Sequence, residues 1–325
     1  FTCRPTSAAQ EETCARTIFS KLASRAFRRP VTDADLRPLL NFFRDGRANG
    51  DFDDGIQSAL QALLVSPDFL YRVEHAPKGA APGTIYRVND YEMASRLSFF
   101  LWSSAPDDEL LKLAAEGKLK DPAILRTQAR RMLDDPRADA LSKNFGGQWL
   151  FLRTLTGVRP DSEIFSNFDE NLRAAFQKET ELYLAGLFRE DRSVLELLDS
   201  NYTYLNQRLA EHYGIPNVYG PNFRKVDLSA ESHRGGLLGQ GSVLTVSSYP
   251  NRTSVVLRGK WVLEKIVGRP PAPPPPDVPA IEPDIRGAKS IREQLAKHRE
   301  LESCAGCHAR IDPHLDLEML VMIRP

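Results

Sequence analysis

Near the end of the chain, Cys304, Cys307 and His308 form a C-x-x-C-H sequence. In proteins that attach haem covalently, two thiols at this spacing bond to the two vinyl groups, and the adjacent histidine gives the iron an axial nitrogen. One helical turn between the cysteines lets both sulfurs reach the same edge of the porphyrin. The motif therefore predicts one covalently bound haem c.

Three other chemistries use closely spaced cysteines. A redox dithiol of the thioredoxin type needs a strand-to-helix junction, and no alternation of strands and helices is predicted here. A zinc site needs further ligands, for which His298 and His314 are the neighbouring candidates. A disulfide between Cys304 and Cys307 would be strained. These three stay as alternatives to haem.

The second axial ligand of the iron is harder to predict. Met319 and Met322 follow His308 too closely for the arrangement in which a distant methionine completes the iron, and His314 is closer still. The candidates are His212, His233, His298, Tyr249, Met319 and Met322. Each of them is equally an ordinary core or surface side chain. An open position would favour peroxide or oxygen chemistry over electron transfer.

The segment SSYPNRTSVVLRGKW is a second candidate site. Its cations Arg252 and Arg258, close in sequence to Tyr249, could pair with haem propionates, which need cationic partners when partly buried. A solvated turn followed by an ordinary helix explains the same residues.

Cys3 and Cys14 are separated by ten residues without a histidine or a further cysteine, which favours a disulfide over a zinc site; two free thiols are the alternative. Such a loop would contribute on the order of 3 kcal/mol. Two adjacent acid pairs, Asp53 with Asp54 and Asp107 with Asp108, are more typical of helix starts than of acid–base or calcium sites.

The elements that position these residues are predicted to be mainly α-helical. Helices are expected over residues 14–30, with Ile18, Leu22 and Phe27 on one face, then over 33–43 and 52–66. Further helices are expected over 89–102, 122–135, 141–151 and 172–187. For 237–266, two helices around a loop are favoured over a strand pair. Residues 270–279 form a stiff polyproline strap.

Composition restricts the partners. The 325 residues carry 43 Lys plus Arg and 43 Asp plus Glu, so bulk charge attracts neither nucleic acid nor an anionic membrane. No apolar run is long enough to span a bilayer, and the N-terminal residues do not resemble a signal peptide. The chain starts at Phe1 and stops abruptly, so we expect a processed or incomplete chain.

Five segments together resemble a known family: CARTIFSKLASRAFRRPVTDADL, YEMASRLSFFLWSSAPDDELLKLAAEGKL, NYTYLNQRLAEHYGIP, RGGLLGQGSVLTVSSYPNRTSVVLRGKWVLEKIVGRPPAPPPPDVP and CAGCHARIDP. They resemble, in order, the large secreted proteins of planctomycetes, acidobacteria and related bacteria that contain domains of unknown function 1595, 1592 and 1588. The resemblance implies a 1595-like helical module at 1–75, a 1592-like helix bundle at 86–220 and a 1588-like domain at 221–325.

In this family a haem motif closes the 1588 domain, and Cys304, Cys307 and His308 match it, followed by Asp312 and Pro313. The family then continues with Gly and a Leu-Glu-Asn-Phe-Asp run, from which this chain departs at His314. The resemblance implies export.

Together the residues predict a periplasmic or extracellular c-type cytochrome that carries electrons to or from redox partner proteins. The alternatives are a haem peroxidase or oxidase, and a haem-bearing structural subunit of a larger redox complex.

Overall fold

The computed structural model describes residues 2–229, 232, 234–273, 305–306 and 311. The chain divides into two compact units, Phe1–Leu141 and Ser142–Pro325. This division falls inside the segment 86–220 that the sequence groups as one helix bundle. The fold is mainly α-helical, as predicted.

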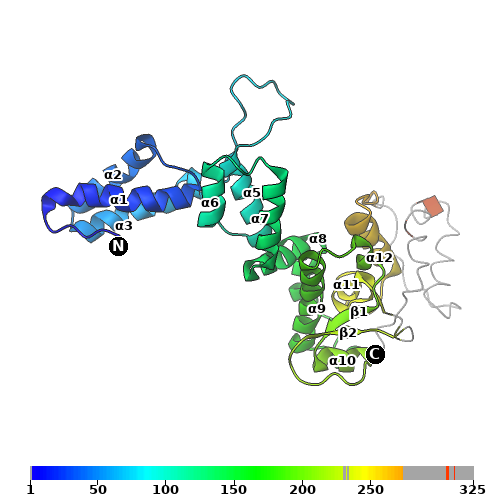
Figure 1. The fold of residues 1–325 in the computed structure, drawn as a ribbon. Helices are drawn as coiled ribbons and strands as arrows, with labels where there is room; N and C mark the ends of the chain where they lie inside the picture. Colours follow the sequence, from blue (N-terminus) through cyan, green and yellow to red (C-terminus); the bar gives the residue numbers. More distant parts are fainter. Residues whose placement is uncertain (1, 230–231, 233, 274–304, 307–310, 312–325) are drawn as a thin grey trace, which may run out of the picture. The chain divides into compact units, whose positions relative to one another are not determined.

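The first unit consists of helices and their connections (Figure 1). Its elements are α1 (Ala8–Phe27), α2 (Asp33–Ala48), α3 (Phe52–Leu64), α4 (Pro67–Leu70), α5 (Asp90–Trp102), α6 (Asp108–Ala115), α7 (Pro122–Asp134) and a 3-10 turn at Pro136–Ala138. The predicted disulfide between Cys3 and Cys14 is confirmed, with the two Cα atoms 5.5 Å apart. It ties the N-terminal arm to α1.

Helices α1, α2 and α3 enclose one apolar core. Phe19, Leu40 and Ile56 are almost fully buried in it, and burial of each such side chain contributes about 1.5–3 kcal/mol. The predicted face of α1 was partly wrong, because Leu22 is 41 % exposed. Side chains spaced by four residues, including Phe19, form the buried stripe instead, which turns Leu22 outward.

Side-chain caps set several helix starts where the sequence predicts them. Asn89 caps α5 and forms a reciprocal pair with Glu92, and Asp121 caps α7 ahead of Pro122. Asp107 caps α6 by accepting a hydrogen bond from the Leu110 amide. The acidic pairs of the sequence thus begin helices, and no group of metal-ligating side chains occurs among the residues with described positions.

The second unit combines helices with a small sheet (Figure 1). Its elements are a π-helix at Leu141–Gly146 that starts at the boundary, α8 (Gly147–Trp149), a 3-10 helix at Leu152–Gly157, α9 (Glu170–Arg189), a 3-10 helix at Val194–Leu197, β1 (Tyr202–Leu205), α10 (Gln207–Tyr213), β2 (Arg224–Asp227), a 3-10 turn at Leu237–Gly239, α11 (Gly241–Val246), α12 (Val255–Trp261) and a π-helix at Val262–Ile266.

Strands β1 and β2 pair antiparallel from Tyr202 opposite Asp227 to Leu205 opposite Arg224. The sequence does not predict this pair, because each strand has four residues and α10 separates them. The helices predicted over 237–266 are confirmed as α11, α12 and the second π-helix.

Two tryptophan indoles of the second unit donate hydrogen bonds to backbone carbonyls of distant helical segments. Trp149 donates its ring N–H to the carbonyl of Lys265, and Trp261 donates to the carbonyl of Leu150 at 3.2 Å. Irregular helical turns leave carbonyls without their usual partners, and here indoles satisfy two of them. The contacts join segments more than 110 residues apart in sequence.

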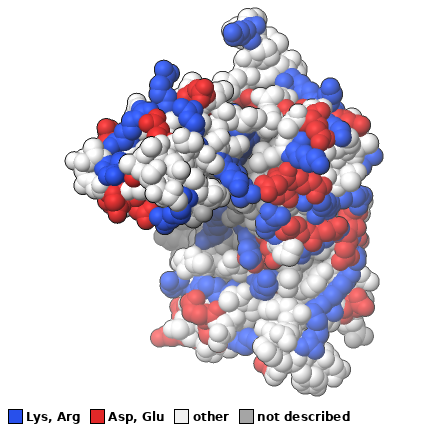
Figure 2. All heavy atoms as spheres, turned by 60° about the vertical axis from the view of Figure 1, so that its left-hand side comes forward, with Lys and Arg blue, Asp and Glu red and all other residues white. Residues whose placement is uncertain are grey.

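Two surface properties follow from the described residues. No helix there has the length and apolarity needed to cross a bilayer. On the face shown in Figure 2, basic and acidic side chains are interleaved rather than gathered into areas of one sign. This agrees with the balanced composition, which excludes a bulk electrostatic preference for polyanions.

Candidate functional site

The proposed haem attachment residues Cys304, Cys307 and His308 lie outside the described residues. The same holds for four candidates for the second ligand, namely His233, His298, Met319 and Met322, and for residues 274–279 of the strap. These assignments stay predictions from the sequence. The structure places the other candidates, His212, Tyr249, Arg252 and Arg258.

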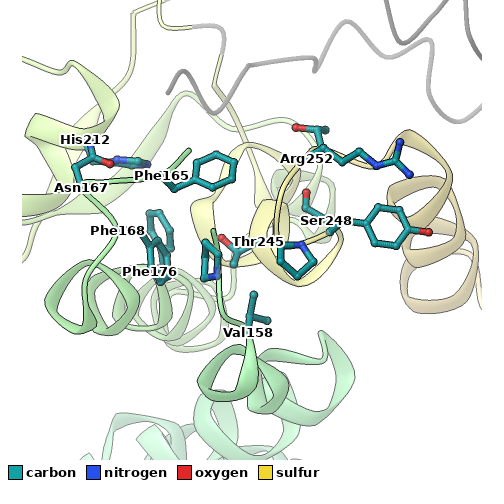
Figure 3. A pocket seen from close by; sticks show the side chains of 13 residues that line it. Val158, Phe165, Asn167, Phe168, Phe176, His212, Thr245, Ser248 and Arg252 are labelled. Carbon is teal, nitrogen blue, oxygen red and sulfur yellow. The ribbon is translucent and has the colours of Figure 1, made fainter. Parts of the chain in front are cut away.

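A pocket in the second unit brings together three of these candidates, His212, Tyr249 and Arg252 (Figure 3). Its walls come from three stretches of chain: the loop 158–168 with the start of α9, the end of α10, and the segment from α11 to the following turn. The cavity volume is about 40 Å³. Most of the lining is apolar, including the rings of Phe165 and Phe168.

Tyr249 and Arg252 line the pocket from the turn between α11 and α12. A backbone hydrogen bond of 3.0 Å from the Tyr249 amide to the Arg252 carbonyl closes the turn. The guanidinium lies 5.1 Å from the centre of the Tyr249 ring, close enough for a cation–π contact. The Pro250 carbonyl accepts from the Asp161 amide at 2.9 Å, which holds the turn against the loop 158–168.

His212 occupies the last turn of α10 and packs edge-on against Phe176, with ring centres 5.3 Å apart. Burial, assisted by the nearby charges of Arg234 and Arg208, lowers the pKa of His212 to about 4. Neither ring nitrogen has a hydrogen-bond partner among the described residues. The side chain is therefore a neutral imidazole at pH 7 with a lone pair available, the form that binds iron or another metal.

Arg258 does not line this pocket. It belongs to α12, and its buried Nε atom has no hydrogen-bond partner in the described part of the chain. Burial lowers the pKa of Arg258, and no carboxylate among the described residues opposes this effect. The structure thus separates the two arginines that the sequence grouped, and it leaves a buried donor on Arg258.

A buried carboxyl group, which the sequence did not predict, is hydrogen-bonded to the residue that follows His212 on α10. Glu179 on α9 is 1 % exposed, and burial raises its pKa to about 7. Thr203 donates to Oε1 and Tyr213 donates to Oε2, each at 2.6 Å. The Tyr213 oxygen in turn accepts the Gly241 amide at 2.6 Å. These four residues form the Glu179 network.

Helical spacing could have revealed this carboxyl group. Leu172, Phe176 and Tyr183 occupy the buried face of α9, and Glu179 lies seven residues after the first and four before the last. A glutamate on an apolar face must find polar partners or lose its charge. The polar partners of Glu179 lie on β1 and α10, so the carboxyl group joins these two elements to α9.

Comparisons with known proteins give three matches in consecutive segments. Residues 14–74 match PSD5 (DUF1595), residues 88–215 match PSD4 (DUF1592), and residues 234–319 match PSCyt3 (DUF1588), each described as a protein of unknown function. The three domains named from the sequence are thereby confirmed, in the expected order. No curated protein matches the chain. No solved structure matches it either.

The pocket can be tested for fit to a haem group. Its donor set suits one, because a neutral imidazole can bind iron and a guanidinium can pair with a propionate. The apolar ring walls would limit access of water. A cavity of about 40 Å³ cannot enclose a porphyrin, so these residues suit contact with one part of the group.

Proposed function

We propose that this chain is an exported electron carrier with one haem c bonded to Cys304 and Cys307 and bound through its iron by His308 and His212. The C-x-x-C-H motif lies inside the segment that matches DUF1588. The observation that carries the assignment of His212 is its neutral, unpartnered imidazole in a pocket that also presents a cation.

Haem supplies one-electron redox chemistry through its iron. In the proposal, the residues of this chain hold and tune that group. His212 gives a nitrogen lone pair, and Arg252 offers N–H donors to a propionate carboxylate. Aromatic walls such as Phe165 keep the surroundings apolar, which together with the axial ligands sets the redox potential.

The disulfide between Cys3 and Cys14 supports the proposed location, because such bonds form and persist mainly outside the cytoplasm. A periplasmic or extracellular carrier would exchange electrons with other redox proteins, either freely or as a subunit of a larger complex. The balanced surface charge favours local contact residues over bulk steering for that exchange.

Haem attachment is tested by producing the full chain in a periplasm that can mature c-type cytochromes. Intact mass and a pyridine haemochrome spectrum should show one haem held by two thioether bonds. The double variant with Cys304→Ala and Cys307→Ala should lack both signals. A wild-type chain of bare mass, with no haemochrome band, would overturn the proposal.

The axial role of His212 is tested by the spectrum of the oxidised protein. With two nitrogen ligands, the wild type should be low-spin and unreactive to cyanide, whereas His212→Ala should become high-spin and bind cyanide. His75→Ala, an exposed histidine of the first unit, is the matched control and should stay low-spin. A low-spin spectrum retained in His212→Ala would reject this ligand. A high-spin wild type that reacts with peroxide would replace the carrier with a haem enzyme.

A further inference from the structure

A second and larger cavity lies in the first unit and shares no lining residue with the pocket of His212. Its volume is about 450 Å³. The end of α1, the segment from α4 to residue 75, and the start of α5 form its walls. Cavities of this size are typical of sites for small organic ligands.

The carboxylates that line this cavity already have partners. Glu74 makes a two-point ion pair with Arg96, and Asp68 lies 3.5 Å from Arg29. Glu92 accepts the backbone amides of Asn89 at 2.9 Å and His75 at 3.0 Å. None of these carboxylate groups accepts a hydrogen bond from the remaining two arginines of the lining, Arg28 and Arg72.

The first of these arginines, Arg28, is fixed and buried. It follows α1 with a left-handed backbone, φ 59°, and only 6 % of it is exposed. Its two terminal nitrogens donate to four backbone carbonyls, those of Ala26, Asp68, Phe69 and Tyr71. Carbonyl oxygens satisfy the donors but carry no net charge, so the positive charge of Arg28 stays without a hydrogen-bonded anion.

The second is Arg72, which approaches the same aromatic ring as Arg28. The guanidinium carbon of Arg72 lies 5.1 Å from the centre of the Phe99 ring, and that of Arg28 lies 5.7 Å from it. Arg72 has no hydrogen-bond acceptor in the described residues, so its five N–H groups are available. Burial lowers the pKa of Arg28, and the charges of Arg72 and Arg29 lower it further against the opposing effect of Asp68.

We propose that this cavity binds a small organic anion whose carboxylate, phosphate or sulfate group is held by Arg72 near the fixed charge of Arg28. A planar guanidinium pairs with such oxyanions through two parallel hydrogen bonds. The volume beyond the arginines accommodates an uncharged body of about the size of a sugar ring, against the rings of Tyr71 and Tyr91. The site is independent of haem.

Isothermal titration calorimetry of the full chain at low salt tests this site. The probes are glucuronate, glucose 6-phosphate, glucose 6-sulfate and neutral glucose, so that the three oxyanions are distinguished on one sugar body. At least one anion should bind at least about tenfold more tightly than glucose, and added salt should weaken it. Failure of all three anions, or equal binding of glucose, would overturn the proposal.

Matched variants separate the site from general electrostatics. Arg72→Ala should weaken the preferred anion by about tenfold or more, and Arg72→Lys should give an intermediate loss because it keeps the charge without the fork. Arg126→Ala removes the same charge from an exposed position on α7 outside the cavity and should change the affinity less than about twofold. Equal losses in Arg72→Ala and Arg126→Ala, at unchanged thermal midpoints, would refute a specific site.

Discussion

Replacing Glu179 by glutamine should remove a pH dependence from the stability of the second unit. Burial raises the pKa of Glu179 from 4.5 to about 7, so the folded state holds a proton that the unfolded chain has already released between these pH values. The stability associated with this group is therefore complete below pH 4.5 and is lost as the pH rises through 7. The loss totals about 3 kcal/mol.

The amide of Glu179→Gln does not ionise, so this loss should be absent from the variant. Thr203 and Tyr213 each donate to one carboxyl oxygen, and an amide offers only one oxygen. The variant will therefore pay a constant cost of about 1–3 kcal/mol for an unsatisfied donor at every pH. The change with pH, and not the absolute stability, identifies the buried carboxyl group.

Urea unfolding at pH 5, 6, 7 and 8, with hydrogen exchange of the α9 amides as a local probe, measures this change. From pH 5 to 8, the free energy of unfolding of the wild type should fall by about 2 to 3 kcal/mol relative to Glu179→Gln. Glu181→Gln removes the same charge from a partly exposed position of α9 and is the control. Burial also lowers the pKa of His212. Because His212 is present in the wild type and in both variants, its contribution to the pH dependence cancels in the comparison.

A difference between wild type and Glu179→Gln that stays constant over this pH range would refute the reasoning. So would a wild type that gains stability relative to the variant as the pH rises. Either result would mean that the carboxyl group is ionised throughout, with its charge compensated inside the protein. The same slope in Glu181→Gln would assign the effect to net charge instead of burial.

Two further substitutions test the packing of each unit. Gly241→Ala should destabilise the second unit by about 1–3 kcal/mol, because the added Cβ would lie 2.2 Å from the ring of Phe176. Thermal unfolding measures the loss, and an unchanged midpoint would contradict this close contact. Replacing Cys3 and Cys14 by alanine should lower the stability of the first unit by about 2–4 kcal/mol, measured by urea unfolding. Intact mass checks that the wild type is oxidised, and equal unfolding midpoints would show that the disulfide contributes little.

The local order of this protein could be predicted from its sequence. Helix starts are encoded by single residues such as Asn89 and Asp121, whose side chains satisfy amides within their own first turn. The disulfide of Cys3 and Cys14 closes a loop of ten residues and also belongs to local sequence. Sequence also predicts the pairs of acids at helix starts, because caps and helix dipoles act over one turn.

Only the tertiary structure brought distant residues together. His212 lies on α10, whereas Tyr249 and Arg252 lie in a turn almost 40 residues later, and sequence patterns cannot place them in one pocket. Arg258 was grouped with that turn by its nearness in sequence, but α12 places it elsewhere. The sequence does not show which segments cover Glu179, because its burial depends on the packing of β1 and α10 against α9.

The physical reason for this division is the range of the interactions. Caps, helical periodicity and short disulfide loops depend on neighbours within about one or two helical turns, so sequence alone determines them. Burial, and the charge state that follows from it, depends on which distant segments exclude water from a group. The burial and the shifted pKa values of Glu179 and Arg28 come from tertiary packing, which exists only in the folded chain.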